Sequence, residues 1–152
     1  FDCTPNPAGQ EKKCMIAFFD TNVVVYMYDD RDRTKQRIAQ QIFLERSEQA
    51  EAVVSMQVIQ EFYAVATRKA GVPKSDARRI AQELLGLGPV VITSNLLEKA
   101  FVLEQELLLS FWDAMILSAA AAVQADVLYS EDFQHDRVYT GVRVVNPFLQ
   151  AT

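Results

Sequence analysis

The sequence predicts a three-layer α/β domain with a mainly parallel sheet. Short, uninterrupted apolar runs alternate with stretches of helical periodicity along the 152-residue chain. Continuous apolar runs are typical of strands that are covered on both faces. Strands that alternate with helices favour a parallel sheet flanked by helical layers. The length fits one domain and is sufficient to bury a sizeable core.

Five apolar runs are expected to form the strands of this sheet. They span residues 16–19, 52–55, 90–92, 127–129 and 142–145. In an open parallel sheet, ligands bind beyond the carboxyl ends of the strands. Polar residues that directly follow these runs are therefore the first place to look for a functional site.

Stripes of apolar residues at helical spacing separate the strands. A helix with the third stripe is expected to begin at Asn95, because Glu98 lies three residues later in a capping-box pattern. Residues 71–73 and 86–89, rich in Gly and Pro, mark breaks between helices. The stripes are Ile38, Ile42 and Phe43; Ala77, Ile80, Ala81, Leu84 and Leu85; and Leu96, Leu97, Ala100, Phe101, Leu107 and Leu108.

The ends of the chain and its composition limit the class of protein. Residues 1–14 are expected to be a disordered N-terminal extension or expression remnant, and residues 15–152 a single domain. Two cysteines are too few for a disulfide framework. No apolar run approaches the roughly 20 residues that cross a bilayer, and no signal-peptide core is visible. We therefore expect a cytoplasmic protein without a membrane contact.

The net charge of −5 argues against a protein that simply coats nucleic acid. This argument weakens if acidic residues gather at a metal site. Without four such carboxylates the charge balance would be close to neutral, so a nucleic-acid substrate is not excluded.

Asp20 and Asp132 each follow a predicted strand, at residues 16–19 and 127–129. If the two strands are neighbours, both carboxylates meet at the same edge of the sheet. Each residue also has a simpler interpretation. Asp20 could cap the following helix, and Asp132 could stabilise a turn.

Glu61 occupies a position where an apolar residue is expected. On a helix from about residue 57 to 69, Val58, Phe62 and Val65 share its face. A charge on such a stripe is rarely structural unless it is paired, although Glu61 could snorkel at the edge of the stripe. Arg68 lies about 10 Å further along the helix, too far for a direct pair but able to approach a substrate phosphate.

Asp113 is the only charged residue between positions 112 and 123. Its spacing from Ser110 fits a capping box, and a carboxylate in the first turn suits the helix dipole. The same placement also directs Asp113 towards the end of the sheet.

Taken together, Asp20, Glu61, Asp113 and Asp132 predict a metal site. Four close anions repel one another, and a hard divalent cation such as Mg²⁺ or Mn²⁺ would compensate them. Such a site can activate water and stabilise the charge that develops on a phosphodiester. Uncharged neighbours could orient the carboxylates: Thr21, Asn22 and Ser130.

The ordered set of these motifs resembles the PIN-domain nucleases. The similarity runs from residue 15 to about residue 148 and covers essentially the whole domain. No single motif is specific to this family, but the ordered set of four acids, with its spacing and flanking strands, is specific. The motifs are Phe18-Phe19-Asp20-Thr21-Asn22-Val23, Ser55 with Gln60-Glu61-Phe62, Trp112-Asp113-Ala114-Met115-Ile116, Tyr129-Ser130-Glu131-Asp132-Phe133 and the closing segment 142–148.

This resemblance implies an α/β/α sandwich with a short parallel sheet and a Mg²⁺- or Mn²⁺-dependent ribonuclease that hydrolyses RNA. A domain of this kind without an RNA-binding module looks most like the VapC-type toxins of toxin–antitoxin pairs. The resemblance further implies a homodimer and a small antitoxin protein that occupies the acidic site.

Other interpretations remain beside the nuclease. A catalytically silent PIN-like module for protein binding is the main alternative. A phosphatase of the haloacid dehalogenase type would require a second Asp at position 22, and the acidic pair and lysine of a receiver domain are missing.

We expect His135 to be a solvated loop residue and Trp112 to belong to the core, although Trp112 could stack a base. The basic runs at residues 31–37 and 78–79 are expected to be solvated faces, with a lesser role in gripping RNA.

Overall fold

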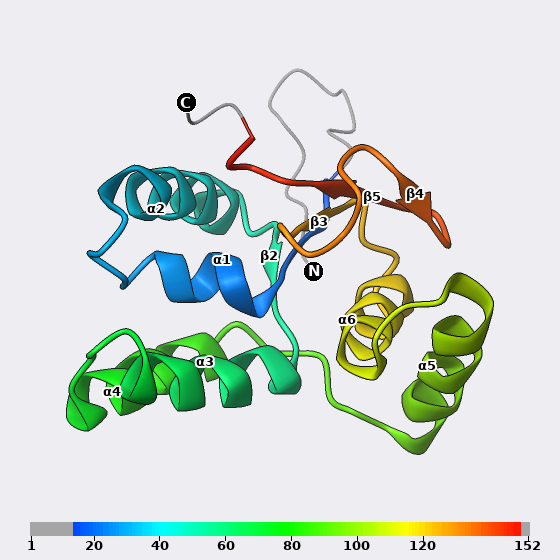
Figure 1. The fold of residues 1–152 in the computed structure, drawn as a ribbon, viewed down its shortest axis with the longest axis horizontal. Coiled ribbons are helices and arrows are strands. Elements are labelled where there is room, and N and C mark those ends of the chain that lie inside the picture. Colours follow the sequence, from blue (N-terminus) through cyan, green and yellow to red (C-terminus); the bar gives the residue numbers. More distant parts are fainter. Residues whose placement is uncertain (1–13, 150–152) are drawn as a thin grey trace.

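The computed structural model describes residues 14–149, which form eleven helices and strands (Figure 1). The predicted N-terminal extension therefore lies, apart from Cys14, outside the described residues, as do residues 150–152 of the predicted domain. In chain order the elements are β1 (Ala17–Phe19), α1 (Thr21–Tyr26), α2 (Arg33–Glu48), β2 (Ala52–Val53), α3 (Met56–Arg68), α4 (Lys74–Leu85), α5 (Ser94–Leu107), α6 (Phe111–Ala122), β3 (Val127–Tyr129), β4 (Val138–Tyr139) and β5 (Val142–Val145).

The strands form one sheet in the order β2-β1-β3-β5-β4. All neighbouring strands are parallel except β4 and β5, which form an antiparallel hairpin. The hairpin turns at Thr140 and Gly141, whose φ angles of 48° and 82° are both positive, as the right-handed twist of a tight hairpin requires. The mainly parallel sheet and the α/β class predicted from the sequence are confirmed.

The register of the sheet aligns the carboxyl ends of its three central strands. Phe19 lies opposite Tyr129, and Tyr129 lies opposite Val145. The ladder extends one residue further, because the Asp20 N–H donates to the Tyr129 carbonyl at 3.0 Å and the Ser130 N–H donates to the Val145 carbonyl at 3.1 Å. Asp20 and Ser130 are thereby fixed at the same sheet edge.

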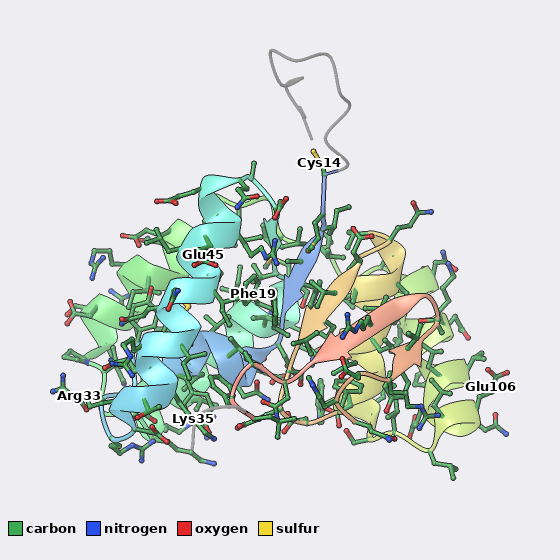
Figure 2. The ribbon with its side chains drawn as sticks, turned by 90° about the horizontal axis from the view of Figure 1, so that it is seen from above. Cys14, Phe19, Arg33, Lys35, Glu45 and Glu106 are labelled. Carbon is green, nitrogen blue, oxygen red and sulfur yellow. The ribbon has the colours of Figure 1, made fainter. Side chains whose placement is uncertain are left out.

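The helices form two groups around this sheet. In Figure 1, α1 to α4 lie on the left and α5 and α6 on the lower right, with the strands above and between them. Phe19 lies between β1 and α2 (Figure 2), where its ring meets the Phe43 ring edge-on at a centroid distance of 4.9 Å. Strands β1 and β3 are buried on both faces, which explains their continuous apolar sequence. Fully buried side chains that hold the layers together include Phe18, Phe62, Leu117, Leu128 and Val144.

Three sequence predictions about the elements were wrong. Residues 90–92 form no strand; only Val90 pairs, in one parallel bridge with Ser55, and Pro89 before it has no N–H to extend the pairing. Helix α5 is capped by Thr93, whose hydroxyl accepts from the Leu96 N–H at 3.2 Å, and not by Asn95. Leu108 lies beyond the helix in the left-handed conformation and is 90% exposed.

Among residues 14–149, no helix combines the length and the apolar character that crossing a lipid bilayer requires.

Candidate metal centre

Asp20 is the most buried acid of the site, with 4% of its surface exposed. One carboxylate oxygen accepts from the Thr21 N–H at 2.7 Å, so Asp20 also caps α1, as its simpler interpretation predicted. The other oxygen accepts from the Ser130 hydroxyl at 2.6 Å. Burial raises the pKa of Asp20 from 3.8 to about 7; the two hydrogen bonds oppose this rise, and the charges of Asp132 and Asp113 add to it.

Ser130 links the acid that follows β1 to the acid that follows β3. Its hydroxyl donates to Asp20 and accepts from the Asp132 N–H at 3.1 Å. The Asp132 carboxylate accepts from the Asn22 side-chain amide at 2.8 Å. Asn22 and Ser130 therefore each donate to the carboxylate of the other motif, Asn22 to Asp132 and Ser130 to Asp20, and so orient these acids.

Glu61 reaches the same region from α3. One of its carboxylate oxygens accepts from the Thr21 hydroxyl at 3.2 Å, and the other accepts from the Gln57 amide at 2.6 Å. Gln57 also donates to the Trp112 carbonyl at 3.3 Å. Gln57 is buried, and sequence reasoning missed it because a neutral amide on an apolar helix face has no charge to attract notice.

Asp113 enters from the first turn of α6. Its N–H donates to the Ser110 hydroxyl at 3.1 Å, which confirms the predicted cap. Partial burial raises the pKa of Asp113, and the charges of Asp132 and Glu61 raise it further, whereas the contact with Ser110 lowers it. The four acids are thus close enough to influence one another electrostatically.

All four acids line one cavity of about 320 Å³. Asp20 and Asp132 lie at the carboxyl edge of the sheet, while Glu61 and Asp113 come from two helices. Apolar side chains complete the wall: Val25, Val65 and Ile116.

Two cationic residues also line this cavity. Arg31 forms a two-point contact with the buried carboxylate of Asp29, with N–O distances of 2.8 and 2.7 Å. Lys69 lines the cavity from the end of α3. Arg68 does not line it: its side chain is exposed and donates to the Ala64 carbonyl of its own helix. Lys69, one residue later, therefore occupies the position expected of Arg68.

The residues of the cavity fit a hard divalent cation. The donors are carboxylate oxygens, and the amide oxygens of Asn22 and Gln57 are buried without a hydrogen-bond partner in the described part of the chain. No three of the described Asp, Glu, His or Cys side chains converge closely enough to form a ready-made metal site. Like charges repel, and hydrogen bonds hold the carboxylates towards separate donors. Cation binding would therefore draw the acids together.

The structure also places three residues that stand near the four acids in the sequence. Glu131 points away from the cavity and pairs with Lys35 at 2.9 Å. His135 is an exposed loop residue, as expected, and its ring accepts from the Asn146 N–H at 3.0 Å. Trp112 is 61% exposed and lines the cavity, so its expected place in the core was wrong.

The fold and this constellation define the class of protein. Residues 17–141 match the sequence model of the PIN domain family, so the chain belongs to that family. PIN domains are generally nucleases that use divalent metal ions. No curated protein matches the chain. Among solved structures, a chain described as "Toxin-antitoxin complex from Klebsiella pneumoniae" superimposes with a TM-score of 0.65 and 23% sequence identity, over 86% of this chain and 97% of that chain. At this identity the likeness shows a shared fold.

Proposed function

We propose that the protein is an endoribonuclease that requires Mg²⁺ or Mn²⁺ and hydrolyses RNA phosphodiesters. The observation that carries this proposal is the meeting of Asp20, Glu61, Asp113 and Asp132 at one cavity, with Asp20 buried at the carboxyl edge of the sheet. An ion bound there would activate a water molecule at neutral pH and offset charge on the phosphoryl group.

The protein's own residues would prepare this site. Thr21 and Ser130 hold the Asp20 carboxylate from two sides, and Asn22 holds Asp132. Thr21 and Gln57 hold the two oxygens of Glu61. These contacts limit the rotamers of the acids, which reduces the entropy lost when the acids close on a cation. The cationic side chains that line the cavity, Arg31 and Lys69, would contact phosphates of the RNA backbone.

We further propose that the protein is the toxin of a toxin–antitoxin pair, of the VapC type. The shared fold with a chain of a toxin–antitoxin complex and the PIN domain support this proposal. In this role the protein would be a cytoplasmic homodimer, and a small antitoxin protein would occupy the acidic cavity. Co-expression with the product of an adjacent short reading frame, followed by purification of a complex that no longer cleaves RNA, would test it.

The nuclease proposal is tested by metal removal and by one pair of matched variants. RNA cleavage should stop in a chelator and return with Mg²⁺ or Mn²⁺. Asp132→Asn should abolish cleavage, whereas Glu131→Gln should retain it, because the Glu131 side chain points to Lys35 and not into the cavity. Equal cleavage by both variants would refute the assignment.

Calorimetric titration with Mn²⁺ separates the nuclease from its main alternative. A nuclease should bind Mn²⁺ and lose this binding in Asp20→Asn. A chain that binds no Mn²⁺ and cleaves no RNA would instead be a catalytically silent PIN-like protein-interaction module.

A further inference from the structure

Trp112 is a large aromatic side chain left in solvent beside the acids. It is the only tryptophan of the chain, and it is 61% exposed. A single exposed aromatic residue is unremarkable by itself. Trp112, however, lines the same cavity as the four carboxylates and directly precedes Asp113. Trp112 is therefore placed to contact a ligand that enters the cavity.

The structure holds the Trp112 backbone and ring in place. The Trp112 carbonyl accepts from the buried Gln57 amide at 3.3 Å. The indole ring meets the Phe111 ring edge-on, with a centroid distance of 4.9 Å and an interplanar angle of 68°. Phe111 in turn stacks on Phe101 at 5.9 Å. A supported indole has little conformational freedom to lose on binding a ligand, which favours binding.

The chemistry around Trp112 suits a nucleotide. Asp113 and Glu61 provide the acidic side of the cavity, whereas Lys69 provides positive charge on its wall; Arg31 also lines the cavity but is paired with Asp29. A nucleotide carries a flat aromatic base and an anionic phosphate, and the cavity offers a partner for each. The antitoxin proposed above would meet the same side chain, because both ligands would occupy this cavity.

We infer that Trp112 is the platform on which a nucleobase of the RNA stacks, beside the phosphodiester that is cleaved. This inference rests on the proposed ribonuclease function. Stacking requires an unpaired base with a free face, because the faces of bases in a duplex are already covered. A base–aromatic stack contributes roughly 5- to 150-fold to affinity.

Intrinsic fluorescence tests the stacking directly, because all tryptophan emission of the chain comes from position 112. The full chain carrying Asp20→Asn is titrated with a short single-stranded oligoribonucleotide of mixed sequence in Mg²⁺, and binding is followed independently by anisotropy of a label on the RNA. The single strand should quench the emission, and the same RNA annealed to its complement should not. Absence of quenching by the single strand would overturn the inference.

Substitutions measure the contribution of the ring. Trp112→Ala should raise the KM for single-stranded RNA by roughly 5- to 150-fold, and Trp112→Phe should restore most of the loss. Leu44→Ala is the matched control: Leu44 is also a large exposed apolar side chain, but it neither lines the cavity nor supports Trp112, so the KM of this variant should stay at the wild-type value. If Trp112→Ala folds poorly, the Trp112→Phe variant and the fluorescence titration still decide.

Two contrary results are distinguishable. An unchanged KM in Trp112→Ala would overturn the inference, while the nuclease proposal would remain. The same holds if this substitution changes only the molar mass of the protein in light scattering, because Trp112 would then make a structural or protein contact. Wild-type protein that quenches with RNA but cleaves none in any metal would instead overturn the proposed function and leave the stacking site.

Discussion

Replacement of Asp20 by Asn should stabilise the protein at neutral pH while it abolishes cleavage. In the folded protein the pKa of Asp20 is about 7, against an ordinary value of 3.8, mainly because the carboxylate is buried. An acid with a raised pKa keeps its proton in the folded state when the unfolded chain has already lost it. Ionisation of Asp20 therefore lowers the unfolding free energy of the wild-type protein, and the Asn variant avoids this loss.

The size and pH dependence of this effect follow from the two pKa values. Below about pH 4, Asp20 is neutral in both states, and its titration makes no contribution. Between pH 4 and 7, the wild-type protein should lose stability as the pH rises, and above pH 7 the loss should be complete. The interval between 3.8 and about 7 corresponds to at most about 4 kcal/mol. Relaxation around the charge reduces it, so we expect a gain of about 1–3 kcal/mol for Asp20→Asn at pH 8.

The Asn side chain should preserve the local contacts. Its amide oxygen can accept from the Thr21 N–H, and its amide nitrogen can donate to the Ser130 oxygen, which replaces the present bond in reverse. The variant should therefore keep the wild-type fold.

Urea unfolding in a chelator, at pH 4 to 8, measures the difference in unfolding free energy between wild type and variant. The difference should grow with pH and then level off. Other acids titrate in both proteins, so their contributions largely cancel. Added Mg²⁺ should reduce the difference, because a cation favours ionised Asp20. A difference that does not depend on pH would refute the reasoning.

Three further predictions concern residues around and outside the cavity. Gln57→Leu should weaken Mn²⁺ binding about 10-fold in calorimetry, because Glu61 loses its 2.6 Å hydrogen bond; an unchanged Kd would contradict this. Glu131→Gln should lower the unfolding free energy by less than about 1 kcal/mol, because its ion pair with Lys35 is partly exposed; a larger loss in urea would show a role that we have not assigned. Gly141→Ala should cost about 1 kcal/mol, since the φ of 82° strains any side chain while the space around it is open; an unchanged unfolding midpoint would contradict the strain argument.

Apolar periodicity in the sequence was sufficient to predict most of the strands and helices. The run at residues 127–129 became β3, because side chains buried on both faces leave a continuous apolar signature. The run at residues 142–145 became β5, although Arg143 within it is exposed. Strand β4 has two residues, too few to show any period, and the sequence did not reveal it. The start of α5 was misplaced because Thr93, Ser94 and Asn95 are all suitable caps, and only the backbone conformation selects Thr93.

Residues of the site could be predicted where a charged side chain stands among apolar residues in the sequence. Glu61 on an apolar stripe and Asp20 after a buried strand were visible for this reason, and both line the cavity. Neutral or distant contributors were not visible. Gln57 carries no charge. Lys69 lines the cavity in place of Arg68, because Lys69 is the C-cap residue, whose φ of −113° departs from the helix, and the Arg68 side chain donates to the Ala64 carbonyl of its own helix. Trp112 was expected in the core because composition cannot distinguish a buried indole from one that rims a cavity.

The bond between Ser130 and Asp20 joins residues 110 positions apart, and this separation affects when the protein can act. Asp20, Glu61 and Asp113 leave the ribosome before Ser130 and Asp132, because synthesis proceeds from the N-terminus. Contacts so distant in sequence also form late in folding, since the intervening chain must first be ordered. A partly synthesised chain therefore holds three acids but no assembled cavity. The order of the residues therefore delays assembly of the cavity until residues 142–145 have also emerged, because β3 lies between β1 and β5 in the sheet.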